Sequence, residues 1–387
     1  MRTGTSDERP CGGESGGWAA WTIFAPRTWC WTLTDRMRIM MIAAANSVHT
    51  VFWANAFVER GHAVHLVSQH PPLPTLADTV QVHRLPHGRG LGYLLNRGRL
   101  ARLIHRVRPD VVNVHYASGY GSLVRGVKGV PVALNVWGSD VFEFPDRSTW
   151  HRAWLLGNLK AARTIISTSE AMAQRVRSLL PDASPITVVP FGVDTSVFIP
   201  PASRKGQDVV VGTVKTLAPT YGIDRLMRAF ARLPAAPDRR LRIVGNGPQR
   251  DALMRLATEL GIAERTDLVG AVPHAQVPDE LHRLTVYVAL SRAESFGVAV
   301  IEASACGLPV VVSDAGGLPE VVRDGVTGFV VPEGDPVVAA RRVEQLLADP
   351  EACARMGAAG RAFVVEHFER SRCVDRMIAV LQQAADT

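Results

Sequence analysis

Short apolar runs alternate with amphipathic stretches from Met37 to the end of the chain. The run MRIMMIAA (37–44) is apolar throughout, which is typical of a parallel strand buried on both faces. Residues 199–207 (IPPASRKGQ) are proline-rich and polar, which predicts a linker between two alternating regions. In the first region the pattern predicts strands at 37–44, 63–68, 110–116, 131–138, 164–169 and 186–194, and helices at 50–60, 94–109, 153–162 and 170–180.

The same alternation restarts after the linker. It predicts strands at 209–215, 240–245, 266–270, 286–291, 309–314 and 328–332, helices at 222–233, 248–260, 277–283 and 298–306, and two closing helices. Strands that alternate with helices indicate parallel sheets. We therefore expect an α/β protein with two Rossmann-like domains, 37–198 and 199–365, that face a central cleft, and a C-terminal helix (366–387) that crosses back to the first domain.

Residues 1–36 do not share this pattern. They are glycine-rich at 12–17, hold four of the eight tryptophans, and lack the period of a strand or a helix. Acidic residues and a proline spoil the pattern of a signal peptide. We interpret 1–36 as a disordered extension or as the product of a misassigned start, with Met37 as the native start.

Composition favours a folded globular protein, because 47% of the 387 residues are apolar and 20% are charged. No apolar run reaches the roughly 18 residues that cross a bilayer. The five cysteines show neither zinc-site spacing nor a disulfide framework, which fits a reducing cytoplasm.

The excess positive charge lies in the first region. Residues 37–198 hold 17 basic and 9 acidic residues, whereas 199–387 hold 22 and 23. The stretch 94–108 carries five arginines (Arg97, Arg99, Arg102, Arg106 and Arg108) between leucines. It predicts either peripheral contact with an anionic membrane surface or a core-facing stripe with a solvated basic face. Nucleic acid is not an expected partner, because no recognition motif or aromatic interleaving accompanies the charge.

Two carboxylates bracket the segment ESFGVAVIE (294–302). Glu294 falls on a loop after the strand 286–291, and Glu302 falls about one turn into the following helix. The first amides of that helix, at residues 297–299, form an anion site. Acids and amides together suit a sugar nucleotide. The alternative is a solvated Glu294 and a Glu302 paired with an arginine.

Four motifs give the chain a family resemblance. They are ESFGVAVIEASACGLPVVVSDAGGLPEVVRDGVTGFVVPEGDP (294–336), LRIVGNGPQ (241–249), VVPFGVD (188–194) and WGSD (137–140). From about Met37 onward the chain resembles glycosyltransferase family 4, whose members are retaining enzymes of GT-B architecture.

The resemblance implies roles for residues of the second domain. Glu294 would contact the hydroxyls of the donor sugar, and Glu302 would contact the nucleotide ribose. Lys215 stands near the diphosphate arginine of the family, and Tyr221 stands where its diphosphate lysine is expected. One cation is therefore missing, and Arg292 is a candidate to replace it. The remaining donor-side candidates are Phe296, Gly297, Val298 and Ala299 along the sugar and diphosphate, and Gly245 and Gly247 near the base.

The first domain would supply the acceptor side. Trp137 stands where the family often has a histidine before Gly-Ser-Asp, so that imidazole contact is absent. Asp140 matches the family pattern, and we count it with Glu294 and Lys215 as catalytic. His49, Thr50 and His115 follow or face strand ends and are acceptor-side candidates, together with Trp137.

These observations predict a metal-independent, retaining glycosyltransferase without a cofactor. It would move a sugar from a UDP- or GDP-sugar to a hydroxyl of a carbohydrate or lipid-linked acceptor, in cell-surface polysaccharide or glycolipid synthesis. The absence of an Asp-x-Asp triplet supports metal independence. We expect it in the cytoplasm or on the inner face of the membrane. The alternatives are a nucleotide-sugar epimerase or phosphorylase of the same fold, and a non-catalytic nucleotide-sugar binding protein.

Overall fold

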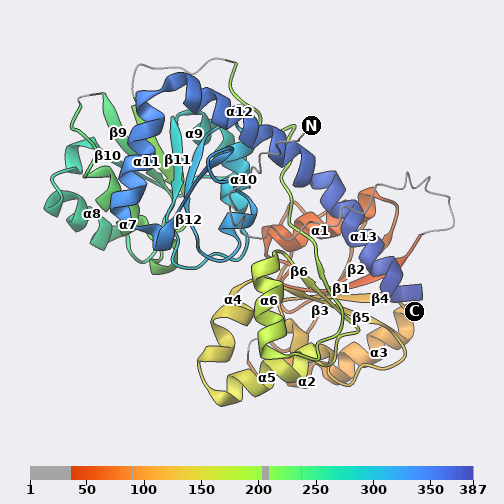
Figure 1. Ribbon diagram of the computed structural model, residues 1–387. Coiled ribbons are helices and arrows are strands. Elements are labelled where there is room, and N and C mark those ends of the chain that lie inside the picture. Colours follow the sequence, from red (N-terminus) through yellow and green to blue (C-terminus); the bar gives the residue numbers. More distant parts are fainter. Residues whose placement is uncertain (1–35, 89, 203–208, 237, 387) are drawn as a thin grey trace, which may run out of the picture. The chain divides into compact units, whose positions relative to one another are not determined.

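The computed structural model describes residues 36–88, 90–202, 209–236 and 238–386 (Figure 1). The predicted N-terminal extension, apart from Arg36, and most of the predicted linker lie outside the described residues.

The first sheet has seven parallel strands in the order β3-β2-β1-β4-β5-β6-β7. Its first strand alternates between two cores, because Ile39 and Met41 pack on one face and Met40 and Ile42 on the other. This confirms the prediction from its continuous apolar run. The strands are β1 (Arg38–Ile42), β2 (Ala63–Ser68), β3 (Gln81–Arg84), β4 (Val111–His115), β5 (Val132–Val136), β6 (Thr164–Ser167) and β7 (Ile186–Val188).

Strand β3 was not predicted. Its sequence QVHR has one apolar residue, and none of its four residues is fully buried, because it lies at an edge of the sheet. Pairing with β2, through contacts such as Leu66 with Val82, places it there.

The predicted helix 94–109 was wrong in its bounds. The structure has a short helix α2 (Gly92–Leu95), a turn at Asn96, and then α3 (Arg97–Val107). The other helices of this half are α1 (Val48–Glu59), α4 (Ser139–Phe142), α5 (Thr149–Leu159) and α6 (Glu170–Leu179).

The second sheet has six parallel strands in the order β10-β9-β8-β11-β12-β13. Figure 1 shows helices on both faces of each sheet, as parallel sheets require. The strands are β8 (Val209–Val214), β9 (Arg239–Val244), β10 (Thr266–Gly270), β11 (Val286–Ala289), β12 (Val310–Ser313) and β13 (Gly328–Val331). The helices between them are α7 (Ile223–Phe230), α8 (Arg250–Glu259), α9 (Val277–His282) and α10 (Val298–Ala305).

Three helices rather than two follow β13. They are α11 (Pro336–Ala348), α12 (Pro350–His367) and α13 (Arg370–Asp386). Helix α13 contacts α1, β4 and β5, so the end of the chain packs on the first half. Arg60, which directly follows α1, binds Asp375 of α13 at 2.9 Å, and the backbone N–H of Val193 donates to the carbonyl of Phe368.

Candidate functional site

Lys215 and Glu294 of the predicted donor site follow neighbouring strands. Strand β8 pairs with β11 in parallel, so their carboxyl ends lie side by side. Lys215 directly follows β8, and the loop that carries Glu294 follows β11. Adjacent carboxyl ends of a parallel sheet are where α/β proteins place ligands.

Lys215 and Glu294 form a buried ion pair. The Lys215 Nζ lies 2.6 Å from Glu294 Oε2, and the side chains are only 11% and 9% exposed. Ser291 donates a second hydrogen bond to the same carboxylate oxygen at 3.3 Å. Burial alone favours the neutral amine, but the attraction of Glu294 outweighs it and raises the pKa of Lys215. The site therefore holds a cation, the Lys215 ammonium, next to the carboxylate of Glu294, which can accept hydrogen bonds from sugar hydroxyls.

Tyr221 and Arg292 lie beside this pair. The Lys215 ammonium sits 4.6 Å from the centre of the Tyr221 ring, which stabilises the cation. Arg292 binds Asp224 with two hydrogen bonds of 2.8 and 2.6 Å. That contact raises the pKa of Arg292 and lowers the pKa of Asp224. Arg292 is thus held by Asp224 and does not contact Lys215 or Glu294 in this conformation.

The loop between β11 and α10 needs glycine at its end. Gly297 has φ of 107°, a left-handed conformation that side chains disfavour, and it is followed directly by α10. The loop also packs against Gly316, where a Cβ would lie 1.9 Å from the carbonyl oxygen of Glu294. Gly316 was not among the predicted site residues. The repeated glycines after β12 were the signal that could have identified it.

The residues that follow Glu294 are available to a ligand to different degrees. Phe296 is 2% exposed and its ring packs against Phe368, so this residue is closed to a donor in this conformation. Val298 and Ala299 are half-buried in the first turn of α10. Their N–H groups precede the first intrahelical hydrogen bond, which Val300 donates to Gly297.

Glu302 is paired with a residue that the sequence did not single out. Its Oε1 lies 2.9 Å from Nε2 of His274, in the loop after β10. The hydrogen bond to Glu302 raises the pKa of His274, although partial burial opposes it. The alternative prediction, that Glu302 pairs with an arginine, was correct about a basic partner and wrong about its type. The signal that could have identified His274 was its position shortly after the end of the predicted strand 266–270.

Gly245 and Gly247 allow two loops to approach each other. A Cβ on Gly245 would lie 1.9 Å from the carbonyl oxygen of Lys215, and one on Gly247 would lie 2.5 Å from that of Leu217. The two glycines therefore let the loop after β9 pack against the loop that carries Lys215.

The acceptor-side candidates form an aromatic cluster at the end of the first sheet. His49 stacks on Phe191 with centroids 4.5 Å apart, and its ring meets Trp137 edge-on at 5.8 Å. His115 also meets Trp137 edge-on, at 5.2 Å. Thr50, the next residue after His49, is fully buried in α1.

Burial disfavours positive charge in this cluster. His115 is 1% exposed, and its pKa falls to about 3 because of burial and the proximity of His49. Burial also lowers the pKa of His49. Neither nitrogen of His115, nor Oγ1 of Thr50, has a hydrogen-bond partner among the described residues.

Asp140 lies too deep to touch a substrate in this conformation. It is 0% exposed, and burial raises its pKa, although backbone N–H donors oppose that rise. Its carboxylate accepts hydrogen bonds from the N–H groups of Ala117 at 2.8 Å, Trp137 at 3.1 Å and Gly138 at 2.8 Å. The geometry gives Asp140 a positioning role for the loop that carries Trp137, in place of the direct catalytic role expected from the sequence.

That loop meets the donor-side loop. A Cβ on Gly138 would lie 2.8 Å from Cβ of Ser295, so the absence of a side chain at Gly138 permits this contact. Glu320, which follows β12, accepts hydrogen bonds of 2.7 Å from the N–H groups of Glu170 and Ala171 at the start of α6. The loops after β5 and β11 are therefore next to each other.

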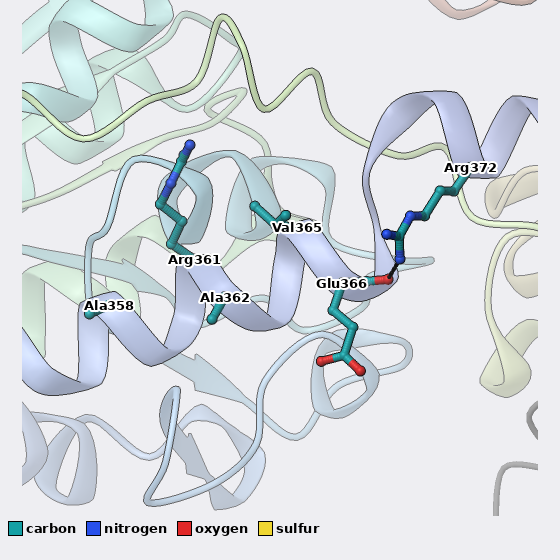
Figure 2. Close-up of a pocket in the computed structure, with 6 residues that line it drawn as sticks. All are labelled: Ala358, Arg361, Ala362, Val365, Glu366 and Arg372. Atoms are coloured by element: carbon teal, nitrogen blue, oxygen red, sulfur yellow. Dashed lines mark hydrogen bonds between the residues drawn. The ribbon is translucent and has the colours of Figure 1, made fainter.

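A separate depression along α12 holds no comparable chemistry (Figure 2). Arg361 donates to the carbonyls of Phe198, Thr195 and Ala305, and Arg372 donates to the carbonyl of Glu366. Within the described parts of the chain, no three His, Cys, Asp or Glu side chains are grouped so as to hold a metal ion. No described helix is both long enough and apolar enough to span a bilayer.

Comparison with known proteins decides the family. Residues 197–363 match the model for glycosyl transferases group 1, and residues 38–169 match the model for glycosyl transferase 4-like proteins. The chain is 32% identical to D-inositol 3-phosphate glycosyltransferase 1 of Catenulispora acidiphila, over 89% of this chain and 92% of that protein. The protein belongs to the group 1 glycosyltransferases.

A second relative and a solved structure extend this result. Over 54% of this chain and 59% of the relative, the protein is 35% identical to a GDP-mannose-dependent alpha-(1-6)-phosphatidylinositol monomannoside mannosyltransferase of Mycolicibacterium smegmatis. Anabaena HepE, solved in complex with UDP and glucose, has the same fold. Its TM-score is 0.76 at 20% identity, over 90% of this chain and all of that chain. The GT-B fold and the family resemblance predicted from the sequence are thus confirmed.

Proposed function

We propose that this group 1 glycosyltransferase moves a sugar from a nucleotide diphosphate donor to an acceptor hydroxyl, with retention of the anomeric configuration. The observation that carries the proposal is the buried Lys215–Glu294 pair at the adjoining carboxyl ends of β8 and β11. A buried cation next to a carboxylate, with the start of α10 beside them, offers one group for phosphate and another for sugar hydroxyls.

The chemistry places developing charge next to Lys215. The acceptor oxygen bonds to the anomeric carbon as the bond from that carbon to the diphosphate breaks, and the acceptor proton passes to the leaving phosphate. Because negative charge grows on that phosphate, Lys215 and the first N–H groups of α10 stabilise the transition state more than the ground state. Attack on the face from which the diphosphate departs gives retention without a protein nucleophile, and the reaction as proposed needs no metal or cofactor.

The other candidate residues take positions around this centre. Glu302 binds the ribose, the loop with Gly245 and Gly247 lies near the base, and Glu294 binds the donor sugar. His49 and Trp137, which are half-buried, face the acceptor, and the buried Thr50 and His115 lie next to them. The names of the M. smegmatis and C. acidiphila relatives support an inositol-containing or lipid-linked acceptor. The transfer would take place in the cytoplasm or at the membrane.

The donor site is tested by thermal unfolding of the full chain with UDP, GDP or ADP, each with EDTA and then with Mg²⁺. A ligand that binds only the folded protein raises the melting temperature as its concentration increases. We expect a shift with one nucleotide that EDTA does not abolish. A shift that requires Mg²⁺ would refute metal independence, and no shift with any nucleotide would refute the donor site.

A second candidate function is a non-catalytic nucleotide-sugar binding protein. It is favoured by Tyr221 at the position of the expected lysine, and by the engagement of Arg292 with Asp224. The variant Glu294→Ala separates the two. Turnover of the donor identified above should fall by orders of magnitude in an enzyme, whereas a binding protein has no turnover to lose and only its affinity changes.

A further inference from the structure

The three exposed leucines of the described chain lie together at the start of one helical segment. Leu91 is 74% exposed, Leu94 is 40% exposed and Leu95 is 62% exposed. Exposed apolar residues scattered singly are normal, but a contiguous group marks an interaction site.

Buried neighbours fix the direction in which these leucines point. Asn96 is fully buried, and its amide donates to the carbonyl of His87 at 2.7 Å. Gly92 is also buried. It packs so closely that a Cβ there would lie 2.5 Å from the same carbonyl oxygen. Gly92, Asn96, Leu100 and Leu103 thus form the inward face, and the leucines of α2 are left on the outer face.

Arginines continue that outer face along α3. Hydrogen bonds from Asn96 to Gly92 and from Leu100 to Asn96 keep the helical spacing across the turn. Arg99, Arg102 and Arg106 lie four, seven and eleven residues after Leu95, and all three are exposed. Residues at this spacing share one face of a helix.

No acidic residue neutralises this face from within its own stretch of sequence. Between Asp78 and Asp110 the chain holds seven arginines and no Asp or Glu. Apolar side chains bounded by uncompensated arginines are the composition that inserts into an anionic lipid surface. Nucleic acid fits less well, because leucines neither stack on bases nor bind phosphate.

We propose that Leu91, Leu94, Leu95, Arg99, Arg102 and Arg106 form a docking surface for an anionic lipid bilayer. The leucines enter the interface between headgroups and acyl chains, and the arginines bind lipid phosphates. This docking surface adds to the proposed function, because docking would present a lipid-linked acceptor to the first half of the protein. It rests on the proposed function in that respect only.

The test is co-sedimentation of the full chain with vesicles of phosphatidylcholine and phosphatidylglycerol in equal amounts, and with vesicles of phosphatidylcholine alone. Binding to the anionic vesicles and weak binding to the neutral ones are expected. Each arginine near the surface contributes about fivefold in affinity, so Arg99→Gln with Arg102→Gln should weaken binding by about 25-fold. Leu91→Gln with Leu95→Gln should weaken it about tenfold.

A matched control comes from the second half of the protein. Met254 is 51% exposed next to the exposed Arg255 on α8, so Met254→Gln with Arg255→Gln removes the same types of group elsewhere. This control should bind vesicles like the wild type. It also corrects for any lipid affinity that lies outside the proposed surface.

Four results would overturn the proposal. They are no binding to anionic vesicles, unchanged binding of the leucine variant, unchanged binding of the arginine variant, and loss in the α8 control equal to that in either variant. Binding of duplex DNA without vesicle binding would replace the lipid with nucleic acid as the partner. Because vesicles are tested without donor or acceptor, and the nucleotide shift is measured on the same variants, failure of docking is distinguishable from failure of the proposed transfer.

Discussion

The two sheets end in polar groups that are satisfied in opposite ways. At the end of the second sheet, Lys215 is paired with Glu294 and His274 with Glu302. At the end of the first sheet, His115 and Thr50 bury polar atoms that have no hydrogen-bond partner among the described residues. The second end therefore pairs its charged side chains with one another, whereas the first leaves His115 and Thr50 unpaired beside an Asp140 that backbone N–H groups hold.

This difference follows from the cost of burial. An unpaired buried charge costs far more than an unpaired neutral group, so Lys215 cannot be buried without Glu294. A neutral imidazole such as that of His115 can remain unpaired at a cost of about 1–3 kcal/mol. We infer that the donor end is preorganised, whereas His115 and Thr50 gain a hydrogen-bond partner only if the acceptor end opens to admit its ligand.

The largest effect is expected at the charged end. Lys215→Met removes the cation that faces the leaving phosphate, and Glu294→Gln removes the charge that holds Lys215 in place. Each should lower kcat by about 10²–10³, the loss typical of removing one preorganised electrostatic group. The measurement is turnover of the donor identified by the nucleotide screen.

The control is another buried ion pair of the same half. Arg242 and Glu280 lie 2.7 Å apart and are 18% and 11% exposed, but their contact is between β9 and α9 rather than at a strand end. Glu280→Gln should reduce stability and leave kcat within about threefold of the wild type. Equal losses of kcat in Glu280→Gln and Glu294→Gln would show that the effect is structural.

Asp140 offers the next largest effect, on stability rather than chemistry. Asp140→Asn replaces one accepting oxygen by an NH₂ group that faces backbone N–H donors. We expect the free energy of unfolding to fall by about 2–4 kcal/mol, measured by urea denaturation. Unchanged stability together with a lost kcat would contradict the positioning role and restore the catalytic role expected from the sequence.

The sequence predicted the strands of both sheets well where they are buried on both faces. Apolar runs such as 209–215 have no other stable environment, so their identity and order could be inferred. Edge strand β3 was missed because a half-exposed strand needs no apolar run. The helix 94–109 was predicted without its turn because the burial of Asn96 depends on the carbonyl of His87, in the loop that precedes the helix.

For the candidate site, the family motifs identified the residues but not their partners. The close contact of Lys215 with Glu294 depends on the pairing of β8 with β11, which the order of strands along the chain does not specify. The pair of His274 with Glu302 depends on where the loop after β10 folds. The expectation that Arg292 replaces a missing cation did not anticipate Asp224, which lies 68 residues away in sequence.

His115 tests the unsatisfied end directly. His115→Leu replaces two unpartnered nitrogens by an apolar group of similar size, so the free energy of unfolding should rise by about 1 kcal/mol while transfer to the acceptor falls. Thermal unfolding and turnover on the same samples measure both. A clear loss of stability instead would mean that His115 already has a partner, and the contrast between the two ends would fail.

The smallest effect concerns His274, whose contact with Glu302 weakens as the pH rises. Its raised pKa means that the folded protein binds this proton more tightly than the unfolded chain does. The stabilisation is therefore fully present below about pH 6.5, the ordinary imidazole pKa, and is lost as the pH rises through the raised value. Because the side chain is 67% exposed, the effect should stay below about 1 kcal/mol.

The melting temperature of the wild type should exceed that of His274→Gln at pH 5.5 and approach it at pH 8.5. Glu302→Gln should abolish the difference between the two, and a difference that persists in that background would assign the effect to another partner of His274.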